Sequence, residues 1–533
     1  MALNNVSKFN NITSKVLIRP GSPVVFKLIP SVSVAGTVMT MTLGTKDTTK
    51  LNKTILLVGE TGTGKSTLIN ALVNYAVGVE WEDNVWFEIV EEKRRSQCMS
   101  QTSDVIVYHI FGFEGKTLPF SLTIIDTPGY GDTAGIKHDD VVSQRLLELF
   151  RSEGGVHEIN AVGLVLKATM NRLDDRQSYI FNSVLSLFGR NMADSIVALI
   201  THSPGRKPAN VLEALEAAKI KCAKDARSQP VYFLFDNCQT EDREEDPDAL
   251  EHADRISVKG MRQFADFLSK SEPKKLQVTV DVLDERENLK VSIKNLRERV
   301  EFIESKQREI MENTEAVMKH REEIEKNKDF KIQTTESYKD KEDYEGGRRW
   351  YTLWLAKSGT LACTTCEENC HDPCSLAWSK GGCEHIKNDH CTKCTKRCHK
   401  SRHVKESWRY VTKTRTVSQT CEEMKSRYEE GKKGHANAES LLKTLQNVME
   451  ELQKDKDKWL EESFQHIVNL EKIALNADSL SIHEHLDFLI KRMEEKGDAE
   501  KIRILKEMKG RVDEGIQAGM RYKGVDGMSM EFD

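Results

Sequence analysis

The stretch GETGTGKST at residues 59–67 decides the fold of the region around it. It follows the apolar run KTILLV (53–58) and leads into STLINALVNYA (66–76), so a predicted strand, a glycine-rich loop and a predicted helix come in direct succession. Its spacing matches G-x-x-x-x-G-K-[ST], in which backbone N–H groups and the helix N-terminus surround a phosphate group. The sequence therefore predicts a phosphate-binding loop here.

Each residue type in this loop has its own expected role. Glycines let the backbone curl round the β-phosphate, Lys65 reaches the β- and γ-phosphates, and the Ser66 hydroxyl binds Mg²⁺. The predicted nucleotide ligands in the loop are Gly59, Gly62, Gly64, Lys65, Ser66 and Thr67.

A second motif, IIDTPG at residues 124–129, is expected to complete the phosphate end. Asp126 ends an apolar strand and can hold Mg²⁺ through water, while the Gly129 backbone N–H can reach the γ-phosphate. Upstream, Thr102 precedes a strand and is expected to sense Mg²⁺ and the γ-phosphate, with Ser100 as the alternative. Alone, either an aspartate or a threonine at such a position is an ordinary turn residue. The predicted Mg²⁺ ligands are Ser66, Thr102 and Asp126, and the predicted catalytic residues are Lys65, Thr102 and Gly129.

Residues 51–245 alternate apolar strand-like runs with helical stretches, which predicts a three-layer α/β domain with a mostly parallel sheet. Residues 1–50 contain short strand-like runs and are expected to form an N-terminal extension that packs on this domain or leads into it. The acidic stretch EDREEDPD (241–248) is expected to close the domain as an exposed loop.

Heptad patterns follow on both sides of a cysteine cluster. They predict a linker and first coiled-coil arm at 246–345, a Cys/His-rich module at 346–415, a second arm at 416–475 and further helices at 476–533. The arms would form a hairpin with the module at its tip. Alternatively, each arm packs on another chain or on the α/β domain. Alternating residues in 330–338 and 407–420 predict strands that could pair across the base of the module.

The composition suits a soluble protein with long solvated helices beside a compact domain. Of 533 residues, 38% are hydrophobic and 31% are charged, and the net charge of −5 is small for this length. No N-terminal signal, lipidation motif or apolar run of membrane-spanning length is evident, so we expect a cytoplasmic protein without a transmembrane segment.

Eight of the twelve cysteines lie within 363–398, which favours metal binding over disulfides in a chain with no secretory signal. A C-x2-C-x3-C-H pattern at Cys363 recurs at Cys391, and such turns present thiolates to Zn²⁺. About two zinc ions are expected. The candidate ligands are Cys363, Cys366, Cys370, Cys374, Cys383, Cys391, Cys394, Cys398, His371, His399 and His403.

The division of these ligands stays open. One crossed partition places Cys363, Cys366, Cys391 and Cys394 at one ion, and Cys370, Cys374, Cys398 with His399 or His403 at the other; two sequential sites are the alternative. An iron–sulfur cluster or regulatory disulfides are further alternatives. The segment 357–415 holds twelve Lys/Arg against six Asp/Glu, which indicates either a nucleic-acid-binding face or, the favoured interpretation, a small module solvated by lysines.

The glycine-rich loop, DTPGYGD (126–132) and the run at 159–189 resemble the septin-related P-loop GTPases, including the GIMAP family and the chloroplast-translocon (Toc) GTPases. The resemblance covers about residues 50–245. It implies GTP/GDP binding, with Thr201 and His202 of ITHS in place of the usual Asn-Lys pair and His202 against the purine face. It also implies that Asp236 and Asn237 of YFLFDNC read the guanine edge; an Asx-turn after a strand is the alternative.

These features predict a GTP-binding switch with slow hydrolysis and nucleotide-dependent self-association as a homodimer or oligomer through the G domain. Tyr130 follows DTPG, where a water-positioning glutamine would stand, and the resemblance implies that a partner G domain supplies or orders catalytic groups. The coiled coil and zinc module would mediate assembly or bind a protein partner. The alternatives are a non-hydrolysing nucleotide-binding scaffold and a nucleic-acid sensor that uses the basic zinc tip.

Overall fold

The computed structural model describes residues 6–9, 12, 15–35, 38–90, 105–128, 136–170, 175–327, 329–343, 359–374, 382–428, 438–476 and 480–511. The chain forms two compact units. The first comprises Met1–Asp284, Leu470–Glu484 and Lys506–Asp533, and the second comprises Glu285–Asn469 and His485–Leu505. Each unit is described separately below.

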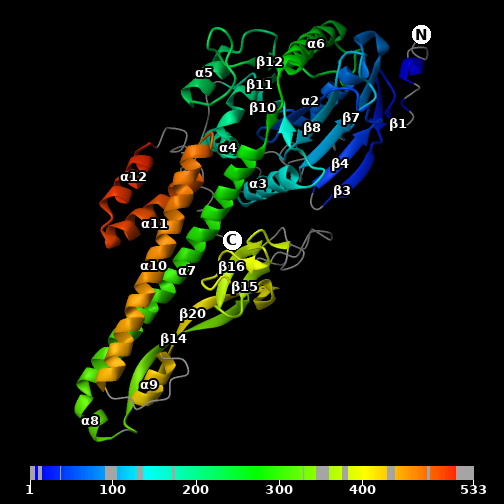
Figure 1. Ribbon diagram of the computed structural model, residues 1–533. Helices are drawn as coiled ribbons and strands as arrows, with labels where there is room; N and C mark the ends of the chain where they lie inside the picture. The colour runs from blue at the N-terminus through cyan, green and yellow to red at the C-terminus, as the bar shows by residue number, and fades with distance from the viewer. Residues whose placement is uncertain are drawn as a thin grey trace. The chain divides into compact units, whose positions relative to one another are not determined.

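A large mixed sheet forms the centre of the first unit (Figure 1). Its strand order is β12 (Tyr232–Leu234), β11 (Ile196–Thr201), β10 (Ala161–Lys167), β5 (Asn52–Val58), β8 (Ser121–Asp126), β7 (Ile106–Ile110), β4 (Val38–Leu43) and β3 (Ser31–Ala35). The pairs β7–β8 and β3–β4 are antiparallel and the others are parallel. The expected mostly parallel sheet is therefore present, although two of its strand pairs are antiparallel.

Helices cover both faces of this sheet, because its central strands are apolar on both sides. On one face, α3 (Ile136–Arg151), α4 (Asp175–Leu185) and α5 (Ala209–Ala217) share a buried cluster with alternate strand residues. On the other face, α2 (Lys65–Val77) and α6 (Pro247–Lys270) bury theirs. The three-layer α/β arrangement predicted for residues 51–245 is confirmed in this coarse form.

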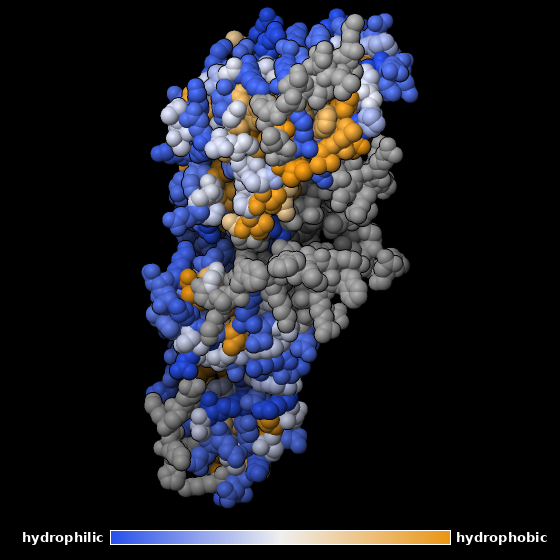
Figure 2. Space-filling model, turned by 90° about the vertical axis from the view of Figure 1, so that its right-hand side faces the viewer, coloured by the Kyte–Doolittle hydropathy of each residue, from blue (hydrophilic) through white to orange (hydrophobic). Residues whose placement is uncertain are grey.

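The N-terminal extension belongs to two sheets. Strands β1 (Lys15–Arg19) and β2 (Val24–Leu28) join β6 (Val85–Glu88) in a three-stranded sheet, whereas β3 and β4 extend the large one. Apolar side chains stay exposed on the outer strands, with Val16 on β1 53% exposed and Val34 on β3 65% exposed. Figure 2, which draws the side where β1 and β3 lie in Figure 1, shows a band of apolar surface in its upper half.

The domain boundary predicted at residue 245 lies too early. Helix α6 is part of the first unit, where Phe264 packs against Phe233 of β12 with ring centroids 5.1 Å apart. A Cβ on Gly260 would lie 2.0 Å from the Leu234 carbonyl oxygen, so the helix backbone touches the strand directly.

Segments beyond α6 also belong to the first unit. The short strands β9 (Glu158–Ile159) and β13 (Lys274–Lys275) pair, and the Leu475 N–H donates to the Phe188 carbonyl at 2.8 Å.

Two long helices organise the second unit: α7 (Gln277–Lys319) and α10 (Ala438–Ile473). The first residues of α7 and the last residues of α10 belong to the first unit. The Arg299 guanidinium group lies 3.6 Å from the centre of the Trp459 ring, and Lys456 Nζ lies 3.9 Å from Glu304. Residues later in α7 therefore contact residues earlier in α10. The two helices are therefore antiparallel, as a hairpin requires. Eight apolar residues at heptad spacing in the predicted first arm are all buried: Leu289, Ile293, Leu296, Val300, Ile303, Ile310, Val317 and Ile324.

Shorter helices complete this part of the chain. They are α8 (Arg321–Lys326), α9 (Cys421–Tyr428), α11 (Leu480–Lys496) and α12 (Ala499–Gly510). In the second unit, Arg492 of α11 bonds to Glu304 at 2.6 Å. No helix within the described ranges combines the length and the apolar character needed to cross a lipid bilayer.

The cysteine-rich module is folded back, which corrects the prediction that it stands at the tip of the hairpin. A two-stranded ribbon of β14 (Lys331–Asp343) and β20 (Trp408–Thr420) leads to it, with Lys331 paired to Thr420 and Asp343 to Trp408. This confirms the expected pairing of the two segments. The module itself contains β15 (Gly359–Cys363), β16 (Glu368–Cys374), β17 (Ile386–Lys387), β18 (His390–Cys391) and β19 (His403–Glu406).

Polar contacts hold the module against the middle of α7. Arg299 bonds to Glu368 at 2.8 Å, and Lys294 bonds to Asp372 at 2.7 Å. Because Asp372 is buried, leaving its carboxylate without Lys294 would be costly, so this docking is specific.

Candidate nucleotide site and cysteine-rich centre

The glycine-rich loop connects β5 to α2, and its glycines are required by geometry. Gly62 and Gly64 have φ of 80° and 88°, in the left-handed region that favours glycine. A Cβ on Gly59 would lie 2.6 Å from the Val165 carbonyl oxygen of the neighbouring β10. The loop thus wraps tightly at the carboxyl edge of the sheet and opens α2, where backbone N–H groups face outward for an anion.

Lys65 is buried over this loop. Its Nζ donates to the carbonyl oxygens of Gly59 at 2.8 Å and Glu60 at 3.1 Å. Burial lowers the pKa of Lys65 to about 8, although the negative charges of Asp126 and Glu60 act in the opposite direction. A phosphate group at the loop would supply charge that these neutral carbonyls lack, so Lys65 is placed to bind one.

The predicted Mg²⁺ ligands Ser66 and Asp126 come from two elements at the carboxyl edge of the sheet. Ser66 lies in the first turn of α2, and Asp126 ends β8 directly beside Leu57 of β5 in the parallel register. The Asp126 carboxyl group is buried, and the next residue, Thr127, donates its hydroxyl to the Leu57 carbonyl at 2.9 Å. Burial and the nearby Asp126 together raise the pKa of Tyr108. Thr102 and Gly129, with Tyr130, lie outside the described residues.

The predicted base-reading residues meet at neighbouring strand ends. Strands β11 and β12 are parallel, and past their ends the Ser203 N–H donates to the Phe235 carbonyl at 3.0 Å. Thr201 and His202 therefore lie beside Asp236 and Asn237 along the sheet edge. The Thr201 hydroxyl bonds to the Thr63 carbonyl at 2.7 Å, which joins this edge to the glycine-rich loop.

His202 is held by backbone geometry, whereas Asp236 is held by its backbone and by a hydrogen bond that its carboxylate accepts from Cys238 Sγ at 3.6 Å. His202 is exposed and has a φ of 50°, so the chain turns sharply after β11. The Asp236 N–H donates to the Ser257 hydroxyl at 2.9 Å, and this hydroxyl donates to Asn237 Oδ1 at 3.0 Å. Burial and the charge of Asp236 raise the pKa of the Cys238 thiol to about 12, so Cys238 stays protonated.

Sequence reasoning missed Ser257. It projects from α6, and the assumed boundary at residue 245 placed α6 outside the domain. In the sequence, the only sign of this role is a serine among the apolar residues of a predicted helix, between Ile256 and Gly260.

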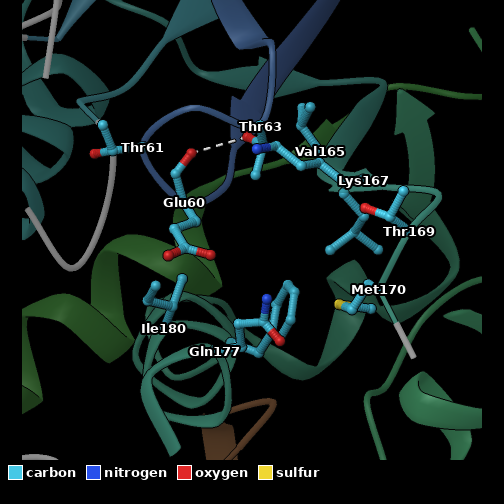
Figure 3. Close-up of a pocket in the computed structure, with 11 residues that line it drawn as sticks. Glu60, Thr61, Thr63, Val165, Lys167, Thr169, Met170, Gln177 and Ile180 are labelled. Atoms are coloured by element: carbon cyan, nitrogen blue, oxygen red, sulfur yellow. Dashed lines mark hydrogen bonds between the residues drawn. The ribbon is translucent and has the colours of Figure 1, made fainter. Parts of the chain in front are cut away.

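A cavity of about 270 Å³ lies beside the loop (Figure 3). Glu60, Thr61 and Thr63 form one side, the end of β10 and the residues that follow it form another, and α4 closes it with Gln177 and Ile180. Neither Lys65 nor Ser66 is among its lining residues, so this cavity adjoins the predicted phosphate site without being that site.

The cysteine-rich module gathers its thiols and imidazoles into compact groups. In each group the donor atoms lie within 4.8 Å of one another. The groups are Cys363, Cys366, Cys394 and Cys398; Cys370, Cys391, Cys394 and His403; His371, Cys374 and Cys383; and His371, Glu384 and His385. This differs from the crossed partition suggested by sequence, because Cys398 rather than Cys391 joins Cys363 and Cys366, and because Cys374 groups with Cys383.

Backbone donors support anionic sulfur in these turns. The Cys366 N–H points to Cys363 Sγ at 3.4 Å, and the Cys394 N–H points to Cys391 Sγ at 3.4 Å. The Cys398 N–H lies 3.1 Å from Cys394 Sγ. Such N–H···S bonds stabilise a thiolate, the form that binds metal.

The histidines divide between the groups and the surface. His399, a predicted ligand, is exposed, and its Nδ1 lies 2.9 Å from the Ser401 hydroxyl, apart from the donor groups named above. His385, which was not among the predicted ligands, is buried, and burial together with the charges of His371 and Lys393 lowers its pKa to about 2. It is therefore neutral and chemically able to act as a ligand.

Comparison with known proteins finds similarity to septins over the phosphate end of the nucleotide site. A septin family model matches residues 49–145. Human Septin-5 is 31% identical over 112 residues, which cover 20% of this chain and 28% of that protein. Human Septin-4 is 30% identical over 112 residues, which cover 20% of this chain and 21% of that protein. The chain thus spans less than a third of the length of these relatives.

Two solved structures align more loosely. Toc33 from Arabidopsis thaliana in complex with Mg²⁺ and GMPPNP has 15% identity over 42% of this chain and 88% of that one, with a TM-score of 0.30. The bacterial dynamin GTPase LeoA has 18% identity over 51% of this chain and 47% of that one, with a TM-score of 0.25.

The septin match begins just before β5 and ends within α3, so it spans the glycine-rich loop, Lys65, Ser66 and Asp126. These are the residues whose geometry forms the phosphate end of the site. Over residues 49–145 the chain is therefore similar to the septins, and it carries a septin-related P-loop domain there.

Proposed function

We propose that this protein is a GTP-binding switch that binds GTP and GDP with Mg²⁺, hydrolyses GTP slowly and self-associates through the G domain when GTP is bound. The observation that carries the proposal is the hydrogen bond from the Thr201 hydroxyl to the Thr63 carbonyl. It ties the strand end before His202 to the phosphate loop, so one nucleotide could reach both ends of the site.

Guanine specificity would come from Asp236. Guanine presents N1–H and the 2-amino group on one edge, and a carboxylate accepts both hydrogen bonds. Adenine presents a bare acceptor at N1, which would leave the carboxylate unpaired and is therefore rejected. The bond from the Asp236 N–H to Ser257 supports this role, because it fixes the backbone that carries the carboxylate. His202 would cover the purine face.

Hydrolysis is proposed to be slow in the isolated chain. Tyr130 occupies the position after DTPG, so the chain supplies no glutamine there to orient water. The predicted roles of Thr102 with Mg²⁺ and of Gly129 with the γ-phosphate remain part of this proposal. A second G domain would then order the catalytic groups, and hydrolysis would rise with protein concentration. We place this activity in the cytoplasm.

The cysteine-rich module is proposed to bind zinc as a structural element. Its small sheets contain few large apolar residues, so metal–thiolate bonds would replace a hydrophobic core. Docked on α7, the module would stiffen the coiled-coil arm, which would mediate assembly or bind a protein partner.

The test is phosphate release by purified full-length protein over a range of protein concentrations, with Lys65→Ala and Lys50→Ala variants. Lys50 is an exposed lysine in a turn of the same domain and serves as the matched control. We expect a specific rate that rises with concentration in wild type and Lys50→Ala. Lys65→Ala should lose nucleotide binding and keep its circular dichroism spectrum.

Unchanged GTP affinity in Lys65→Ala would refute the site. Tight GTP binding without phosphate release at any concentration would favour the non-hydrolysing scaffold instead.

A further inference from the structure

The first two donor groups of the cysteine-rich module share one member. Cys394 belongs both to the group with Cys363, Cys366 and Cys398 and to the group with Cys370, Cys391 and His403. Two tetrahedral zinc ions need eight ligand positions, whereas these two groups contain one donor fewer. The numbers agree when the Cys394 thiolate occupies a position on both ions.

Distances and tautomers fit this arrangement. Two thiolates on one tetrahedral zinc, with Zn–S bonds of about 2.3 Å, lie about 3.8 Å apart, and Cys366 Sγ lies 3.7 Å from Cys398 Sγ. His403 Nδ1 is 3.2 Å from the His399 carbonyl, to which only an N–H can donate. The lone pair is therefore on His403 Nε2, which is buried and has no hydrogen-bond partner within the described ranges. An aimed, unpartnered imidazole nitrogen is what a metal ion would satisfy.

Three of the remaining donors form a separate group. His371 Nδ1 lies 3.3 Å from Cys383 Sγ, and Cys374 completes this group. The other ring nitrogen of His371, Nε2, faces Glu287 Oε1 at 3.5 Å, as in carboxylate–histidine–metal arrangements.

His385 lies beside this group but belongs, with His371 and Glu384, to a different set of donors. Its ring centroid is 4.7 Å from that of His371, it is buried, and its Nε2 has no hydrogen-bond partner among the described residues. Glu384 Oε1 lies 3.9 Å from His371 Nε2 and 3.8 Å from His385 Nε2, whereas Cys383 faces His371 Nδ1, so neither Glu384 nor His385 is assigned to this ion.

We infer that the module holds three zinc ions: a pair bridged by the Cys394 thiolate, and a single ion bound by His371, Cys374 and Cys383. The inference deepens the zinc binding stated under the proposed function and rests on it. Six thiolates around the paired ions exceed the charge of two dications. The nearby Lys393 ammonium group is buried, donates to the Ser292 hydroxyl of α7 at 2.9 Å and lies 3.9 Å from Glu462 of α10.

The first measurement is the zinc content of the full chain by native mass spectrometry. We expect three ions in wild type and three in Cys421→Ser, a control at a buried cysteine of α9 outside the module. Cys383→Ser should retain two ions, because only the single site is lost. His385→Gln and Glu384→Gln should both retain three ions, because neither residue is assigned to an ion.

The second measurement tests the bridge without any substitution. In protein whose zinc has been replaced by Co²⁺, a shared thiolate couples two of the three spins, so their paramagnetic resonance signal is suppressed while the third remains. Cys383→Ser should remove the uncoupled signal and leave the coupled pair.

Each contrary outcome is distinct. Two ions in wild type, unchanged in Cys383→Ser, would overturn the single site. Three uncoupled Co²⁺ signals would overturn the bridge. Loss of an ion in His385→Gln or in Glu384→Gln would overturn the ligand set of the single ion. Absence of bound zinc, or a brown iron–sulfur chromophore, would overturn the proposed zinc module itself.

Discussion

Single hydroxyl groups set the geometry of the nucleotide site. Thr201 bonds to Thr63 in the glycine-rich loop, and Ser257 bonds to the backbone of Asp236 and to the side chain of Asn237. Both hydroxyls are buried or nearly so, and a buried hydrogen bond is costly to break because its partner is left unsatisfied. The positions that would read the base are thus fixed before any nucleotide arrives, which lowers the ordering cost of binding.

The first prediction concerns Asp236. Asp236→Asn should weaken GTP binding at least tenfold, because two charge-assisted hydrogen bonds, each worth about 1.5–3 kcal/mol, are altered and about 1.4 kcal/mol corresponds to tenfold. The same variant should favour xanthosine triphosphate, whose 2-oxo group accepts from the new amide. The measurement is a titration with GTP, ATP and xanthosine triphosphate.

Two variants at the neighbouring strand end serve as controls. His202→Ala should weaken GTP and xanthosine triphosphate alike, because stacking does not distinguish the base edges. Pro204→Asp should change little. If Asp236→Asn keeps the preference of wild type for GTP over ATP, Asp236 is not the base reader.

At the scale of elements, α6 positions β12 through direct backbone contact. Gly260 has no Cβ, so the helix reaches the Leu234 carbonyl, two residues before Asp236. The position of the proposed base reader therefore depends on a glycine in a helix that lies beyond the acidic loop.

The second prediction follows from that contact. Gly260→Ala should push α6 away from β12, destabilise the protein by about 1–3 kcal/mol and weaken GTP binding. Gly510→Ala is the matched control, since Gly510 is helical and has open space at its Cβ position. It should be neutral or slightly stabilising. Thermal unfolding and a GTP titration of both variants provide the measurement, and equal behaviour of the two would contradict the proposed contact.

A buried carboxylate joins α7 to the ribbon and to α9. Glu309 accepts hydrogen bonds from the Ser337 N–H at 2.7 Å, from Lys306 at 2.9 Å and from the Tyr428 hydroxyl at 2.5 Å, and it also contacts Arg427. Burial acts to raise the pKa of Glu309, but the bonds from Tyr428, Ser337 and Lys306 outweigh it, so the pKa is lowered.

The third prediction uses the sign of this shift. A lowered pKa stabilises the fold above the ordinary glutamate value of about 4.3, and this contribution is lost as the pH falls through the folded-state pKa. Glu309→Gln should therefore lower the melting temperature at pH 7, by an amount corresponding to about 1–3 kcal/mol, and the difference from wild type should shrink at acidic pH.

Glu312→Gln provides the comparison, because Glu312 is exposed on the same helix and should be near neutral at every pH. A gap between wild type and Glu309→Gln that stays constant from pH 7 to pH 3 would contradict the lowered pKa.

At the scale of the whole molecule, the sequence was informative where local pattern and neighbouring strands agree. The motif around Lys65 predicted strand, loop and helix correctly, and the strand ends at Thr201 and Asp236 come together because β11 and β12 are parallel neighbours. The ribbon of β14 and β20 was predicted from alternation alone. These features depend on the spacing of apolar and polar residues over short stretches, which can be read from the sequence alone.

The sequence was less informative where distant side chains decide. Nothing local indicates that Arg299 on α7 binds Glu368, so the folded-back module was predicted at the hairpin tip. The acidic loop resembled a domain end, although the apolar face of α6 beyond it packs on β12. The grouping of Cys374 with Cys383 depends on the local fold of the module, which cysteine spacing does not specify.

Self-association would connect the two units of the molecule in one function. If GTP loading brings two G domains together, each coiled-coil arm is brought along with them, and the zinc module would keep that arm stiff. The proposal therefore requires that the assembly state follow the bound nucleotide rather than the protein concentration alone.

The most direct test of this account is the mass of the full-length protein by light scattering, with GDP and with a non-hydrolysable GTP analogue, at the same protein concentration. We predict the mass of one chain with GDP and at least twice that mass with the analogue. Lys65→Ala should give the mass of one chain in both. The same mass for wild type with either nucleotide would contradict the account.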